Sequence, residues 1–124
     1  MNMKVGEILN YINEFAPWGY AENWDNVGLM LGSRQIEINK ILLCMDVTSK
    51  VIKEAISYEA GLIISHHPFM FTKLNALDFD TIKGQQIQTL VTKNISVISA
   101  HTNLDVAVGG VNDTLAETIG LSEL

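Results

Sequence analysis

Residues 41–68 read ILLCMDVTSKVIKEAISYEAGLIISHHP, and the pattern of this stretch decides the fold. The stretch holds the apolar part of a strand predicted over 40–45 and a second apolar run at 62–64, and both are typical of buried strands. Between them, apolar residues recur at helical spacing behind Thr48 and Ser49, either of which can cap a helix. A strand, a helix and a second strand in this order predict a βαβ unit with parallel strands.

The same alternation continues on both sides of this unit. A helix predicted over 81–93, with Asp80 as its cap, and a strand over 95–100 extend the parallel sheet. Upstream, apolar residues at helical spacing predict a helix over 5–15, and a short strand follows at 27–32. The sequence therefore predicts an α/β fold with a mainly parallel sheet and helices on its faces. A length of 124 residues fits a single domain.

The charge balance excludes several kinds of partner. Acidic residues outnumber basic ones, 14 to 8, and the formal net charge is −6. This charge repels phosphate backbones and anionic membrane surfaces, so we expect no direct binding to nucleic acid or membranes. No apolar run approaches the roughly 20 residues of a membrane span, and the first residues lack a signal-peptide pattern. We therefore expect a cytoplasmic protein.

The polar residues best suited to bind a ligand or take part in catalysis all follow predicted strands. Asp46 follows the first strand of the opening stretch, His66 and His67 follow the second, and His101 and Asp105 follow the strand at 95–100. Sites in open parallel sheets form beyond the carboxyl ends of the strands. If these strands are parallel, the five residues share one edge of the sheet.

The adjacent pair His66 and His67 points to a metal site. Neutral imidazole binds zinc, manganese, iron, cobalt or nickel. Neighbouring side chains on an extended backbone diverge, so the two histidines suit two ions side by side better than one ion. Pro68 favours an extended conformation at His67 and would help to fix the direction of the pair. The alternative is that both histidines lie at a strand end without a ligand.

The segment from His101 to Asp105 adds a second part to this pattern. If it forms a helical turn, residues four apart lie on one face, and the imidazole and the carboxylate point the same way. A carboxylate has two oxygens and can bridge two cations. The alternative is an aspartate that caps the turn beside a solvated histidine. All three histidines of the chain fall in these two segments, which favours metal binding.

Three further features have simpler interpretations. Asp46, beside Thr48, fits the start of a helix better than a residue that orients a metal ligand. Trp24, in an acidic and aromatic loop, fits a buried side chain. Phe69 and Phe71, close to the histidine pair, fit core packing better than a stacking platform.

Together, these segments carry a family resemblance across nearly the whole chain. The matching parts are the opening helix, Trp24-Asp25-Asn26-Val27-Gly28-Leu29, the strand ending at Asp46, Ile63-Ile64-Ser65-His66-His67-Pro68, Ala100-His101-Thr102-Asn103-Leu104-Asp105 and Gly109-Gly110-Val111-Asn112-Asp113. With them, the chain resembles the dinuclear-metal-centre family, also called NGG-interacting-factor-like or YbgI-like. Many of its members are labelled GTP cyclohydrolase I type 2 homologues.

The resemblance implies a site, a fold and an assembly. It implies that His66, His67 and Asp105 are ligands to two divalent metal ions, with His101 at or near the metals. It implies a three-layer α/β/α fold and a toroidal homohexamer whose metals face an inner cavity. The function implied is that of a metal-dependent hydrolase of the GTP cyclohydrolase type, with a nucleotide or small molecule as substrate. The alternative is a non-catalytic ring that binds metal or a partner and has a regulatory role.

One departure from the family pattern concerns length. Family members are about twice as long or longer, and their second half supplies a His-x-x-x-Glu pair that completes the metal site. This chain contains no such pair, so it is expected to be the amino-terminal half of a two-lobed protein. Zinc and similar ions take at least four ligands, so the site in this fragment is expected to be incomplete and the fragment inactive.

Overall fold

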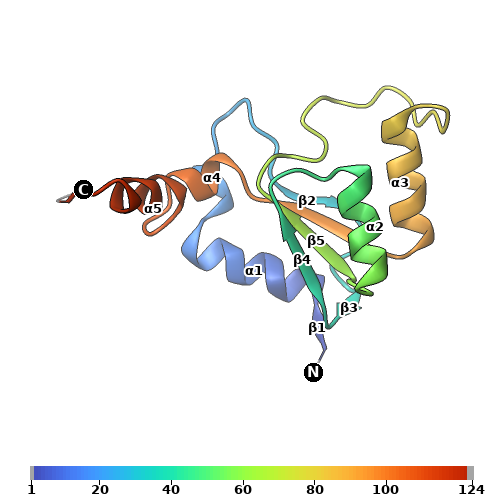
Figure 1. The fold of residues 1–124 in the computed structure, drawn as a ribbon, viewed down its shortest axis with the longest axis horizontal. Helices are drawn as coiled ribbons and strands as arrows, with labels where there is room; N and C mark the ends of the chain where they lie inside the picture. Colours follow the sequence, from blue (N-terminus) through green and yellow to red (C-terminus); the bar gives the residue numbers. More distant parts are fainter. Residues whose placement is uncertain (1, 123–124) are drawn as a thin grey trace.

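The computed structural model describes residues 2–122, which form a sheet between two layers of helices (Figure 1). The strands are β1 (Met3–Lys4), β2 (Gly28–Leu31), β3 (Glu37–Ile38), β4 (Ile41–Cys44), β5 (Leu62–Ser65) and β6 (Ser96–Ser99). The helices are α1 (Val5–Phe15), α2 (Ser49–Ser57), α3 (Ile82–Thr92), α4 (Thr102–Asp105) and α5 (Val111–Thr118), with a 3-10 turn at Trp18–Tyr20. No helix among the described residues combines the length and the apolar character needed to cross a bilayer.

The main sheet has four strands in the order β2-β6-β5-β4. β4, β5 and β6 run parallel, and β2 runs antiparallel to β6 at one edge. The prediction of an α/β fold with a mainly parallel sheet is confirmed. The short strands β1 and β3 pair with each other in a separate sheet.

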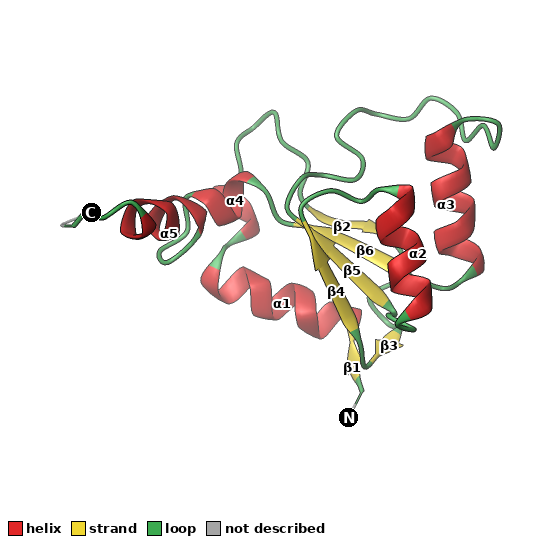
Figure 2. Cartoon of the chain, viewed as in Figure 1, coloured by secondary structure: helices red, strands yellow, loops and turns green. Residues whose placement is uncertain are grey.

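Helices cover both faces of the sheet, as Figure 2 shows. Alternate residues of a strand point to opposite faces. Leu62 of β5 therefore packs in the cluster formed with α1, while Ile63 packs in the cluster formed with α2 and α3. The three-layer α/β/α arrangement follows from this division.

Side-chain caps fix where the two crossover helices begin. The hydroxyl of Thr48 accepts a hydrogen bond from the backbone N–H of Val51, 3.1 Å away, and starts α2. The expected cap of α3 was Asp80, but Thr81 takes this role by accepting from the N–H of Gly84. A hydroxyl at this position satisfies a backbone donor that the helix itself leaves unpaired.

The prediction of a fully buried strand is wrong for β4. This strand lies at the edge of the sheet, and only one of its faces is covered. Leu42 and Cys44 pack against the α2 and α3 cluster. Leu43 points to the opposite face, beyond the reach of α1, and is 73% exposed. A strand of apolar residues at an edge has the composition of a buried strand, so the sequence alone did not distinguish the two.

The two faces of β4 and β5 lead to a paired stability prediction. Leu62→Ala removes a fully buried side chain and should lower the free energy of unfolding by about 2–5 kcal/mol. Leu43→Ala, on the same face of the neighbouring strand, should cost less than about 1 kcal/mol because its side chain is already in water. Urea denaturation of the two variants measures both. Equal losses would show that the exposed face of β4 is covered in solution.

Candidate metal centre

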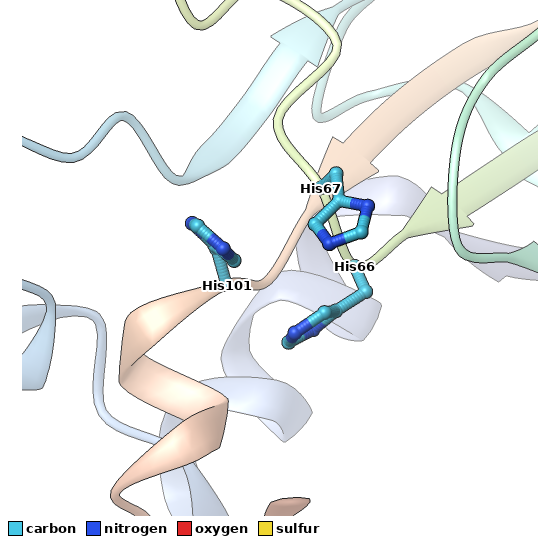
Figure 3. A group of neighbouring side chains, drawn as sticks. All are labelled: His66, His67 and His101. Atoms are coloured by element: carbon cyan, nitrogen blue, oxygen red, sulfur yellow. The ribbon is translucent and has the colours of Figure 1, made fainter.

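The three histidines converge beyond the carboxyl ends of β5 and β6 (Figure 3). His66 and His67 directly follow β5, and His101 lies between β6 and α4. Each residue offers a ring nitrogen, and these three nitrogens lie within 4.8 Å of one another. The ring centroids are 5.1–5.6 Å apart. The structure thus brings the imidazole of His101 to those of His66 and His67, which lie more than 30 residues earlier in the sequence.

Asp105 contacts this histidine cluster through His66. The backbone N–H groups of Leu104 and Asp105 donate to the carbonyl oxygen of His101, so the segment forms the expected helical turn. Oδ1 of Asp105 then lies 3.3 Å from Nε2 of His66. All four residues that the sequence singled out, His66, His67, His101 and Asp105, therefore lie in one place.

Each imidazole is held through its Nδ1 atom by an acceptor. Nδ1 of His66 lies 2.9 Å from the carbonyl oxygen of Ala100. Nδ1 of His67 lies 2.9 Å from Asp46 Oδ1, and Nδ1 of His101 lies 3.1 Å from Asp25 Oδ1. Carbonyl and carboxylate oxygens only accept, so each Nδ1 carries the proton, and a neutral ring has its lone pair on Nε2. This is the tautomer in which histidines commonly bind metals.

Asp46 is therefore a partner of His67 and not a helix cap. The interpretation of Asp46 as part of the helix start is wrong, because Thr48 alone supplies the capping oxygen. The less favoured interpretation, an aspartate that orients a histidine, matches its position.

Asp25 is the residue of the site that sequence reasoning missed. Its side chain is fully enclosed and accepts hydrogen bonds from Thr102 Oγ1 at 2.6 Å, Thr102 N at 3.1 Å and His101 Nδ1 at 3.1 Å. Burial raises the pKa of Asp25, but the bonds from Thr102 and His101 outweigh this and leave the pKa below its ordinary value. Asp25 lies 76 residues before His101, and no local pattern links the two.

Buried serines fix the loop that carries the histidine pair. Ser65 Oγ donates to the carbonyl oxygen of His67 at 2.9 Å. The hydroxyl of Ser65 has a single proton, so in the 2.8 Å bond between Ser65 and Ser99 the donor is Ser99. Ser99 Oγ in turn accepts from the N–H of Phe69. This chain of bonds locks the turn after β5 to the end of β6.

Comparison with known protein families identifies the family to which this chain belongs. The model of the family described as Duf34/NIF3 (NGG1p interacting factor 3) matches residues 3–124. The chain belongs to this family. For this Duf34/NIF3 chain, a relative from Clostridium perfringens named GTP cyclohydrolase 1 type 2 homolog is 46% identical over 121 residues. These residues make up 98% of this chain and 46% of the relative.

Solved structures similar to this chain have the same fold. The Bacillus cereus protein related to NIF3 has a TM-score of 0.92 and 38% identity, covering 98% of this chain and 33% of that protein. Reduced HcgD from Methanocaldococcus jannaschii has a TM-score of 0.92 and 34% identity, covering 99% of this chain and 49% of that protein. The chain thus spans half or less of the length of these proteins.

Two interpretations of aromatic residues near the site are wrong. Trp24, expected to be buried, is 61% exposed. Phe69 is buried as expected, but Phe71, two residues further on, is 55% exposed. The two exposed rings lie side by side, with centroids 6.0 Å apart. The loops that carry them approach each other only in the folded chain, so the sequence contained no signal for this pair.

Asp25 should stabilise the fold as well as orient His101. Asp25→Ala would leave the N–H and hydroxyl of Thr102 without their acceptor and should lower the free energy of unfolding by about 1–3 kcal/mol. Asp80→Ala is the matched control, because that side chain is exposed, and it should change stability by less than about 0.5 kcal/mol. Chemical denaturation measures the free energy of unfolding of both variants. Similar losses for Asp25→Ala and Asp80→Ala would rule out the proposed anchoring by Asp25.

Proposed function

We propose that His66, His67, His101 and Asp105 contribute to a dinuclear centre of divalent metal ions. The observation that carries this proposal is the contact between His66 Nε2 and Asp105 Oδ1 at 3.3 Å. Nδ1 of His66 donates to the carbonyl oxygen of Ala100, so a neutral ring would present the lone pair of Nε2 to the carboxylate of Asp105. Two sets of lone pairs repel unless a cation lies between them. A proton can fill this role, and so can a metal ion bound by both side chains.

The donor atoms of the cluster fit a transition metal. Imidazole nitrogens with a carboxylate oxygen suit zinc, manganese, iron, cobalt or nickel, whereas magnesium and calcium prefer oxygen ligands alone. The partners on Nδ1, which include Asp46 and Asp25, fix the tautomer and the ring orientation of His67 and His101. The family resemblance implies two ions at these residues, which supports a dinuclear centre. Four side chains do not saturate two ions, each of which takes at least four ligands.

We propose that this chain is the amino-terminal half of a longer, two-lobed protein. The missing metal ligands would then come from the second lobe. The chain covers only 46% of the Clostridium perfringens relative, which leaves room for such a lobe. Apolar side chains also lie uncovered around the site. Leu43 is exposed on β4, Val108 is 93% exposed, and α5 has no buried residue. Exposed apolar surface of this kind marks places where other protein packs.

In the complete protein, the proposed activity is metal-dependent hydrolysis of the GTP cyclohydrolase type. Bound divalent ions would supply an acidified water molecule and polarise the bond to be cleaved. The residues of this chain would hold and orient the ions. The name shared by the curated relatives, together with the donor set of the histidine cluster, supports this assignment. The toroidal homohexamer implied by the resemblance is part of the same proposal.

Weak but localised metal binding is the expected behaviour of the chain on its own. Titration with Mn²⁺ should broaden the NMR signals of His66, His67 and the segment 101–105 first, because a paramagnetic ion broadens the nuclei nearest to it. After gel filtration, elemental analysis should find less than one metal ion per chain, against about two in the full-length Clostridium perfringens relative. His66→Ala should remove the localised broadening.

The exposed acidic loop at Asp78 and Asp80 provides the internal control for this titration. Broadening that begins there, or that spreads evenly over the chain, would exclude a metal site at the histidines. Tight binding of two ions by this chain alone would instead contradict the proposal that the site needs a second lobe.

The hydrolase assignment requires the full-length relative. Loaded with Mn²⁺ or Zn²⁺, it should turn over GTP, and alanine at the positions that align with His66 and Asp105 should lower kcat/KM by at least about a hundredfold. Product analysis by liquid chromatography measures this. Saturable GTP binding with no turnover would instead support the non-catalytic, regulatory alternative.

A further inference from the structure

A pocket of about 600 Å³ lies beside the histidine cluster. The two loops that line it rise at the same end of the molecule (Figure 1). One loop contributes residues 23–26 and the other residues 70–74. We propose that this pocket binds the flat ring of a nitrogen heterocycle that carries an anionic substituent. Its volume lies within the range of about 300–1,000 Å³ that is usual for small-molecule sites.

The pocket presents two aromatic rings to solvent. Trp24 and Phe71 have centroids 6.0 Å apart and planes inclined by 58°, so each ring meets the other at an angle. More than half of each side chain remains exposed, at 61% and 55%. Water-exposed indole and phenyl rings are unfavourable unless something covers them, and a planar ring gains both apolar contact and π-stacking from them.

The walls of the pocket are formed before any ligand arrives. Asn26 Nδ2 donates to the carbonyl oxygen of Met70 at 2.7 Å and ties one loop to the other. The N–H of Glu22 donates to Thr102 Oγ1 at 2.9 Å, and Asp25 accepts from the same threonine. A pocket held by such bonds loses little conformational entropy when a ligand binds.

Two polar side chains of the pocket have free hydrogen-bonding capacity. Asn23 and Lys73 line the pocket, and neither side chain makes a hydrogen bond or an ion pair with any residue in 2–122. The amide of Asn23 can both donate and accept, which suits the polar edge of a heterocycle. The ammonium of Lys73 suits a phosphate or carboxylate substituent. These groups distinguish the expected ligand from a plain hydrocarbon.

The pocket and the histidine cluster share a wall. The ring of Trp24 lies 6.3 Å from that of His101, centroid to centroid, and Asp25 both lines the pocket and holds His101. A ligand whose ring rests on Trp24 would therefore have other atoms close to the proposed metals. The role of this pocket as a substrate subsite rests on the proposed function, whereas its binding of the heterocyclic ring does not.

NMR titrations in the presence of EDTA test ring binding without metals. Guanosine 5′-monophosphate is the probe, and ribose 5-phosphate is the matched ligand that lacks the ring. The nucleotide should shift the signals of Trp24, Phe71 and Thr72, while ribose 5-phosphate should bind at least about tenfold more weakly. Trp24→Leu and Phe71→Leu should each weaken the nucleotide by about tenfold.

Tyr58→Leu is the control variant, because Tyr58 is an equally exposed aromatic residue outside the pocket. The proposal is overturned if this variant weakens the nucleotide as much as Trp24→Leu does, or if ribose 5-phosphate binds equally well. It is also overturned if Trp24→Leu changes the mass of the chain in light scattering, because the rings would then cover a protein interface. Because EDTA removes metals, these titrations can succeed even if the histidines bind no metal ion. Conversely, failure of the nucleotide to bind would not change the result of the Mn²⁺ titration.

Discussion

The parallel pairing of β5 with β6 is the constraint on which the site depends. Its register places Ser65 opposite Ser99, so the next residues of both strands leave the sheet side by side. The N–H of Ala100 donates to the carbonyl oxygen of Ser65. The carbonyl oxygen of Ala100 in turn accepts a hydrogen bond from Nδ1 of His66. A slip of one residue would turn every side chain of the strand to the opposite face and separate the histidines.

Around this pairing, the chain uses polar groups from distant segments to hold the imidazoles still. Asp46 comes from the end of β4 and Asp25 from the loop before β2, and each holds one histidine through Nδ1. The buried hydroxyls of Ser65 and Ser99 complete the support beneath them. Burying a carboxylate such as Asp25 is costly, and here four hydrogen bonds offset the cost. The arrangement fixes the orientation of the three imidazoles at the expense of apolar packing.

The two ends of the molecule differ in completeness. Between the helices, residues such as Leu62, Val97 and Ile98 are fully buried, and the core needs nothing further. Beyond the strand ends, α5 contributes no buried side chain, and the histidine cluster lies near exposed aromatic rings. The fold is therefore closed at its core and open at the histidine cluster, as the proposed second lobe and ligand would require.

Local patterns determined much of this protein without any coordinates. The strands and helices of the βαβ units, the parallel sheet and the convergence of His66, His67, His101 and Asp105 follow from periodicity and from the position of polar residues after strands. Only the tertiary structure decided that β4 is an open edge, that Asp25 and Asp46 orient the histidines, and that Trp24 meets Phe71. The physical reason is distance along the chain. Periodicity reports the environment of neighbouring residues, whereas these contacts join side chains up to 76 residues apart, and only packing in three dimensions pairs them.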